Sequence, residues 1–229
     1  MSAQRIRVWF RKGERIRYIS HLDVLRFWER AIRRAGLPLA YSQGFTPHPR
    51  LAFASPLPLG FIGEAEIMDV TLDERVTLES FRARVAAQAS DDLILTNVAE
   101  VPAGAPAPQS CLAWADYRVD VPALDPADAG AAIEAFLARD AMEWVDDRRE
   151  KARTIDLRDG VSELAAGPLD GGTRLTMRLR AHQDLTIRPE VVVAALFPGH
   201  EPGMIARVAL HLDEPSPARD AWRRRGRYE

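Results

Sequence analysis

Two stretches of this sequence show the same order of expected strands and helices, and a proline-rich segment at residues 102–108 separates them. Apolar residues that alternate with polar ones indicate strands, and apolar residues spaced three or four apart indicate helices. The first stretch has the order β-α-β-β-α-β, and its middle pairing is carried mainly by residues 50–54 and 64–72. Its expected strands are residues 5–11, 37–41, 50–54, 64–72 and 93–101, and its expected helices run from Ser20 to Ala35 and from Thr77 to Ala89.

The second stretch resembles a more elaborate copy of the first, without a residue-level repeat. Asp170-Gly171-Gly172 is a strong signal for a hairpin turn between two of its strands. Its expected strands or extended arms are residues 114–121, 142–147, 151–157, 161–166, 173–181 and 204–212, and its expected helices are residues 125–138 and 190–196.

These patterns predict an α+β protein made of two tandem ferredoxin-like (β-α-β-β-α-β) sandwiches with antiparallel sheets. The expected divisions are a basic domain at residues 1–101, a Pro/Ala-rich linker at 102–111, a second, elaborated domain at 112–213 and a basic tail at 214–229. A length of 229 residues is enough for two small domains.

The cysteine content and the hydropathy pattern exclude several classes of protein. Cys111 is the only cysteine, so this chain by itself forms neither an internal disulfide nor a cysteine-ligated cluster or structural zinc site. No run approaches the roughly 18 apolar residues of a membrane span. The N-terminus enters a strand pattern with no apolar signal segment, which predicts a cytoplasmic location and no membrane partner.

Charge is distributed unevenly along the chain. Residues 1–50 hold eleven Lys or Arg against three acidic residues, a balance of +8, whereas the whole chain has a net charge of −2. A basic lobe on an acidic body predicts local attraction of an anion. A well-solvated, arginine-rich surface explains the same pattern equally well.

The first polar constellation is Ser20-His21-Leu22-Asp23, at the start of an expected helix. His21 lies in the first turn, where free backbone N–H groups favour a phosphate and an imidazole can move a proton. Ser20 and Asp23 also fit the two positions of a helix-capping box, which gives them a purely structural role.

The second constellation is the loop after this helix, where Tyr41 and Phe45 alternate with polar groups and Pro47 and Pro49 stiffen the backbone around His48. Aromatic rings beside arginines are typical of single-stranded RNA recognition, although the loop also reads as a simple turn. The residues predicted to bind RNA or another substrate are Ser20, His21, Asp23, Arg26, Arg30, Arg34, Tyr41, Ser42, Gln43, Gly44, Phe45, His48 and Arg50.

Metal-dependent and cofactor-dependent chemistry has little support in the motifs. His21, His48 and Asp23 match no known ligand spacing, so no metal site is expected, and no cofactor is expected either. The sequence has no phosphate-binding Walker loop, dinucleotide fingerprint, nucleophile elbow or zinc-protease motif. His21 and His48 remain candidates for metal-independent acid–base catalysis.

Several phrases of the chain resemble a known bacterial family. These are RYISHLDVLRFWERAIRRAGLPLAYSQGFTPHPRLAFASPLPLG, EAEIMDV, REKARTIDLR and RPEVVVAAL, and the resemblance extends over about residues 5–212. They resemble the radical-SAM-linked proteins of unknown function, which occur alone or joined to the C-terminal side of a B12-binding radical SAM enzyme. The resemblance implies a radical SAM protein as partner, and the lone Cys111 implies that the radical chemistry belongs to that partner.

The N-terminal half is also distantly similar to the CRISPR repeat-processing endoribonucleases, which are tandem ferredoxin-like RNA binders. The glycine-rich loop that those enzymes carry near their C-terminus is absent here, which favours RNA binding over RNA cleavage. The expected function is therefore an RNA-binding or substrate-presenting module that works with a radical SAM enzyme, more in keeping with a binding role than with catalysis. Two alternatives stay open: a metal-independent endoribonuclease that uses His21 or His48, and a protein-docking adaptor.

Overall fold

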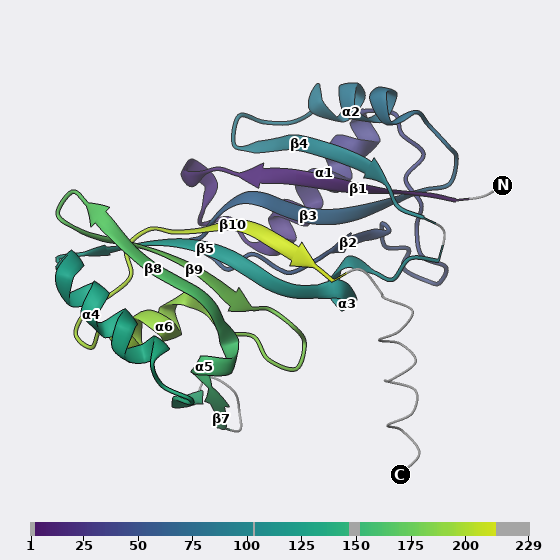
Figure 1. Ribbon diagram of the computed structural model, residues 1–229. Helices are drawn as coiled ribbons and strands as arrows, with labels where there is room; N and C mark the ends of the chain where they lie inside the picture. Colours follow the sequence, from purple (N-terminus) through teal and green to yellow (C-terminus); the bar gives the residue numbers. More distant parts are fainter. Residues whose placement is uncertain (1–2, 103, 147–151, 214–229) are drawn as a thin grey trace, which may run out of the picture.

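The computed structural model describes residues 3–102, 104–146 and 152–213 of the chain (Figure 1). The basic tail expected at residues 214–229 lies outside this range. The first half contains β1 (Gln4–Lys12), a 3-10 turn η1 (Glu14–Ile16), α1 (His21–Arg34), β2 (Leu51–Phe53), β3 (Ile62–Leu72), α2 (Leu78–Ala86), β4 (Leu93–Glu100) and α3 (Pro108–Cys111). The second half contains β5 (Leu112–Pro122), α4 (Pro126–Leu137), β6 (Glu143–Asp146), β7 (Arg153–Asp156), α5 (Leu157–Gly160), β8 (Val161–Leu169), β9 (Gly172–Arg180), α6 (Pro189–Leu196) and β10 (Ile205–Leu212).

The protein is a mixed α+β structure with one large, mostly antiparallel sheet, and the described residues include six α-helices. The strand order is β4-β1-β3-β10-β5-β9-β8, and β2 pairs with β3 off this path. When only the strands of this large sheet are counted, each half places its four strands in the order fourth, first, third, second. The short hairpin of β6 and β7 forms a separate two-stranded sheet.

One strand pair joins the two halves. The sequence predicted a separate antiparallel sheet for each half, but β10 pairs in parallel with the start of β3, through Ala206 opposite Ile62 and Arg207 opposite Gly63. The cause is the length of β3: its eleven residues extend beyond the segment that β2 covers, at Met68 to Val70, and leave the first residues free to pair. The result is a continuous sheet across the molecule (Figure 1).

Two hydrophobic cores lie under the helices. In the first half, the alternate residues Ile6, Val8 and Phe10 of β1 are buried with Trp28 of α1 and Phe81 of α2. In the second half, the inward residues of β5 and β9 are buried against α4 and α6, and this core extends into the first half through Ala54, Phe61 and Ile67. The shared core, like the shared sheet, ties the halves together.

Two expected segments differ in detail from the structure. Residues 37–41, predicted to be a strand, form only isolated bridges, Leu39 with Leu72 and Tyr41 with Pro49, in a stretch where Pro38 lacks a backbone N–H donor. Within the predicted linker, residues 108–111 form the short helix α3. Arg5 Nη2 donates a hydrogen bond of 2.6 Å to the carbonyl oxygen of Ala105 and fixes this connection against β1. No helix in the described part of the chain is both long and apolar enough to cross a membrane.

Candidate functional site

The start of α1 is held by the capping box that the sequence predicted. Ser20 Oγ accepts a hydrogen bond from the backbone N–H of Asp23 at 3.2 Å, and Asp23 Oδ2 accepts from the backbone N–H of Ser20 at 3.3 Å. The Ser20 hydroxyl also donates to Asp23 Oδ2 at 2.7 Å, and this hydrogen bond is the main reason that the pKa of Asp23 is lowered. Both side chains are thus already engaged by the helix end.

His21 lies beside a small cavity at the same end of α1. Its ring meets the ring of Phe53 edge-on, with centroids 4.7 Å apart, and the side chain is half-buried. The cavity measures about 10 Å³, the space of a single water molecule, and Lys12, Ser55 and Glu66 contribute its polar lining. Burial lowers the pKa of His21, so the imidazole is neutral at physiological pH.

A buried ionic cluster surrounds this cavity, and sequence reasoning did not find it. Lys12 is 1% exposed, and its Nζ donates to the carbonyl oxygens of Arg17 at 2.8 Å and Ile19 at 3.2 Å, which fixes the loop ahead of α1. Burial lowers the pKa of Lys12, although the Glu66 carboxylate opposes that effect. Glu66 itself is paired with Arg207 of β10. These groups stabilise the junction between the halves and leave little room for a ligand.

The outer face of α1 carries the arginines. Arg26 lies 3.5 Å from Asp23, and Arg33 lies 4.0 Å from Glu29. Arg30 and Arg34 are exposed, and within the described part of the chain no ion pair is recorded for either. Arg33 was not among the residues predicted to bind RNA. It pairs with Glu29, the same carboxylate that contacts Tyr41 of the following loop.

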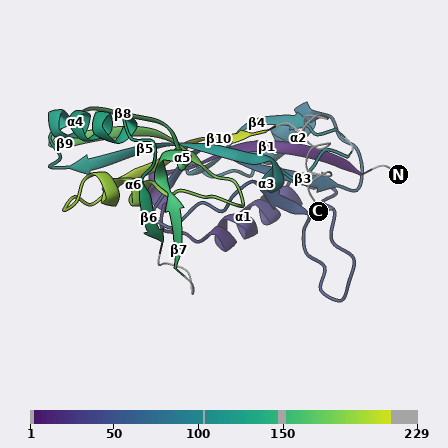
Figure 2. The same cartoon turned by 60° about the horizontal axis from the view of Figure 1, so that its bottom comes forward.

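That loop is a hairpin whose base is closed and whose tip is exposed. The backbone N–H of Ser42 donates to the carbonyl oxygen of His48 at 2.8 Å, and the backbone N–H of His48 donates to Ser42 Oγ at 2.9 Å. Beyond this base the segment projects from the body of the protein (Figure 2). The side chain of Phe45 is fully exposed, at 110% of its reference area. The other predicted residues, Gln43, Gly44, His48 and Arg50, are exposed as well.

Tyr41 joins the loop to the helix. Its hydroxyl donates to Glu29 Oε1 at 3.3 Å. Burial and the neighbouring carboxylate raise the pKa of Tyr41, so the phenol keeps its proton and remains a donor. We call the exposed arginines of α1 and seven residues of the 41–50 segment together the α1–loop surface: Arg26, Arg30, Arg33, Arg34, Tyr41, Ser42, Gln43, Gly44, Phe45, His48 and Arg50.

The structure separates the two candidate histidines. His21 faces the small cavity, whereas His48 lies exposed in the hairpin loop, and no contact between them is recorded. Groups of three or more His, Cys, Asp or Glu side chains that could hold a metal ion are not found in residues 3–102, 104–146 and 152–213. The arrangement therefore offers two distinct regions, a closed cavity at His21 and an open surface with the loop.

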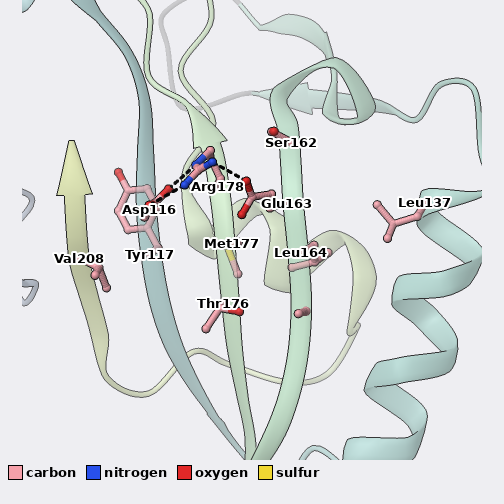
Figure 3. Close-up of a pocket in the computed structure, with 11 residues that line it drawn as sticks. Asp116, Tyr117, Leu137, Ser162, Glu163, Leu164, Thr176, Met177, Arg178 and Val208 are labelled. Carbon is pink, nitrogen blue, oxygen red and sulfur yellow. Dashed lines mark hydrogen bonds and ion pairs between the residues drawn. The ribbon is translucent and has the colours of Figure 1, made fainter. Parts of the chain in front are cut away.

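A larger hollow lies on the second half, where β5, β8 and β9 run side by side (Figure 3). It measures about 490 Å³. Asp116 accepts two hydrogen bonds from Arg178, at 2.7 and 3.1 Å, and lies 2.8 Å from Nε2 of His211, while Arg178 also pairs with Glu163. The hollow thus holds two carboxylates against one guanidinium and has no excess of positive charge, in contrast to the arginines of α1.

Comparison with known proteins gives a family and weak structural likeness. A chain from the crystal structure of a Cbf5-Nop10-Gar1 complex has a TM-score of 0.48 at 10% identity, over 90% of this chain and 48% of that one. This chain thus spans about half of that neighbour. An unknown protein from Galdieria sulphuraria has a TM-score of 0.28 at 13% identity, over 91% of this chain and 100% of that one. No curated protein matches. A family described as an uncharacterized protein conserved in bacteria (DUF2344) matches residues 5–189, and the chain belongs to this family.

Proposed function

We propose that this chain is an RNA-binding or substrate-presenting module that works with a radical SAM enzyme partner in RNA modification or processing. The α1–loop surface is the proposed binding site. The observation that carries the proposal is the hydrogen bond from Tyr41 to Glu29, because it holds a loop with an exposed aromatic tip beside a row of exposed arginines. Guanidinium groups that track phosphates beside rings that stack on bases are the features of single-strand RNA binders.

Electrostatics supports this surface over the rest of the molecule. Residues 1–50 carry a balance of +8 in a chain whose net charge is −2, and Arg30 and Arg34 have no recorded acidic partner in the described structure. In the second half, Arg178 is paired with both Asp116 and Glu163, so that hollow has no free positive charge to offer a phosphate. A polyanion therefore gains most where the arginines remain free to exchange counterions for phosphates.

The experiment that tests the proposal is ultraviolet crosslinking in cells, followed by sequencing of the bound RNA and mass spectrometry of the crosslinked peptides. We expect crosslinks within residues 18–50. Crosslinks confined to the second half would show that RNA binds there and not at the α1–loop surface. The absence of any crosslinked RNA would contradict the proposal. The RNA sequences recovered would also name the substrate.

We also propose the finer description of the fold and setting. The strand order of each half, fourth-first-third-second, supports a tandem ferredoxin-like arrangement in which β10 and β3 join the two units. The proposed location is the cytoplasm, where RNA substrates and a radical SAM partner occur. The partnership itself rests on the sequence resemblance, and co-purification of a tagged chain with a radical SAM protein would test it.

A metal-independent endoribonuclease is the second candidate. The lowered pKa of His21 favours it, because a neutral imidazole can accept a proton from a ribose hydroxyl. It predicts RNA cleavage by the purified protein in EDTA that is lost in His21→Ala. If the activity persists in His21→Ala and is lost in His48→Ala, His48 is the catalytic residue. If both variants remain active, the endoribonuclease proposal is wrong. The third candidate, a protein-docking adaptor, predicts a stable partner complex that survives ribonuclease treatment.

A further inference from the structure

We infer that the ligand of the α1–loop surface is an unpaired RNA segment, held by stacking of separate nucleobases on the rings of Phe45 and Tyr18. This inference rests on the proposed function and specifies its substrate class. Tyr18 lies outside the residues that the sequence pattern selected. Exposed aromatic rings just before α1 and in the loop after it, on either side of the arginine-bearing helix in the sequence, are the basis of the inference.

Phe45 is the first stacking position. Its ring is fully exposed at the tip of the hairpin loop, and Gly44 before it has a φ of 138°, a conformation that L side chains rarely adopt. The base of this loop is closed by two hydrogen bonds between Ser42 and His48, so the tip is presented on a defined stem. Because no other residue of the chain covers this ring, its faces are available for a nucleobase to stack on.

Tyr18 is the second stacking position, at the opposite end of α1. Its side chain is 67% exposed. The guanidinium carbon of Arg17 lies 4.9 Å from the ring centroid, and Arg17 Nη2 donates to the Tyr18 hydroxyl at 3.3 Å. Gly60 lies beside the ring, with a φ of 84°, and a Cβ there would come within 3.6 Å of Tyr18 Cε1. The ring thus carries the positive charge of Arg17 next to it and remains largely open to solvent.

The residues of α1 that lie next to the two positions are farther apart along the helix than a stacked dinucleotide is long. Tyr18 lies just before His21, the first residue of α1, and the loop joins α1 at Glu29, eight residues later. At about 1.5 Å per residue the axis of α1 advances by about 12 Å between His21 and Glu29. Stacked nucleotides are about 3.4 Å apart along one strand, so a dinucleotide reaches only one ring. Arg26 lies within this interval of α1, and Arg30 follows Glu29 directly; both side chains are exposed.

Duplex RNA does not satisfy this arrangement. In a paired helix the faces of the bases are covered by their neighbours, and protein side chains reach mainly phosphates, 2′-hydroxyls and base edges. Rings that act by stacking need bases that are already unpaired or splayed out. The arginines, in contrast, attract either form through phosphate contacts. The rings therefore set the preference for single strands, and the arginines supply the general affinity.

Fluorescence anisotropy with the full chain tests this inference. The probes are labelled ten-nucleotide single strands of uridine and of adenosine, a dinucleotide and a ten-base-pair RNA duplex, all at one salt concentration. We expect single strands to bind at least about tenfold more tightly than the duplex. Loss of one stacked base corresponds to about a tenfold weaker Kd. Phe45→Ala and Tyr18→Ala should each show this loss on the single strands and no change on the duplex.

Conservative variants distinguish stacking from general apolar contact. Phe45→Trp and Tyr18→Phe keep a ring and should keep the affinity, whereas Phe45→Leu keeps apolar bulk without a π-face and should behave like Phe45→Ala. Because Phe45 is fully exposed, none of its variants should alter folding. Full affinity in Phe45→Leu, or equal binding of duplex and single strand with silent Phe45→Ala and Tyr18→Ala variants, would overturn the inference while leaving RNA binding intact. Absence of binding to every RNA probe would instead contradict the proposed function.

Discussion

Glu66 of β3 and Arg207 of β10 form a buried ion pair that joins the two halves of the sheet. Arg207 Nε lies 2.8 Å from Glu66 Oε1, and each side chain is only 3% exposed. Burial alone would lower the pKa of Arg207, but the Glu66 carboxylate raises it, so the guanidinium stays charged. Arg207 also donates two hydrogen bonds to Ser55, one to the hydroxyl oxygen at 3.2 Å and one to the carbonyl oxygen at 3.0 Å. The pair fixes the position of the second half relative to the cavity of His21.

Removing one member of this pair should destabilise the protein strongly. We expect Arg207→Met to lower the free energy of unfolding by about 3–5 kcal/mol, because it leaves the Glu66 carboxylate buried without its partner. The double variant Arg207→Met with Glu66→Leu should be more stable than Arg207→Met alone. Urea denaturation measures both. Glu64→Ala, which removes the partly exposed partner of Arg118, is the control and should cost no more than about 1 kcal/mol.

The burial of His21 predicts a dependence of stability on pH. Its folded pKa is lowered from 6.5, so the unfolded chain binds the proton more tightly than the native chain. The stability contributed by neutral His21 is therefore present above about pH 6.5 and is lost as the pH falls through the lowered pKa. Melting temperatures between pH 7.5 and pH 5 should fall more steeply for the wild type than for His21→Gln. Parallel curves would show that His21 does not carry this effect.

Removing the capping box should lower the stability of the fold and leave RNA affinity unchanged. Ser20→Ala should reduce the free energy of unfolding by about 1 kcal/mol, because the backbone N–H of Asp23 loses its side-chain acceptor and keeps only the carbonyl oxygen of residue 20. Ser20→Asn, which can also cap a helix, should recover most of that loss. RNA affinity, measured well below the melting temperature, should be the same in all three proteins. A large affinity change in a stable Ser20→Ala protein would instead place the hydroxyl in the binding site.

Local sequence patterns predicted the elements more reliably than their assembly. The capping box at Ser20 and the hairpin turn at Asp170-Gly171-Gly172, where Gly171 has a φ of 73°, follow from chemistry within a few residues, and both were predicted correctly. The parallel pairing of β10 with β3 joins Arg207 to Gly63, which are far apart in the sequence. Periodicity within one segment carries no information about such a contact, so the single continuous sheet was missed.

The same limit explains the candidate site. The sequence indicated the loop and the arginines of α1 because these are polar or aromatic residues in segments that prolines, glycines and a helix cap mark as surface. Lys12 and Glu66 were missed because a charged residue in an alternating strand normally faces solvent, and only the buried partner Arg207 makes the burial of Glu66 tolerable. Arg33 was missed because its distinguishing contact, Glu29, is shared with Tyr41 of the following loop.

The salt dependence of RNA affinity tests the central claim most directly. For a single strand, the logarithm of the association constant should fall linearly with the logarithm of salt concentration, with a slope set by the number of phosphates neutralised. We predict that Arg30→Ala weakens binding and reduces this slope by about one, whereas Arg139→Ala, an exposed arginine beside α4 on the other half, leaves both unchanged. Identical affinities and slopes for the wild type, Arg30→Ala and Arg139→Ala would contradict the assignment of the α1–loop surface as the RNA-binding site.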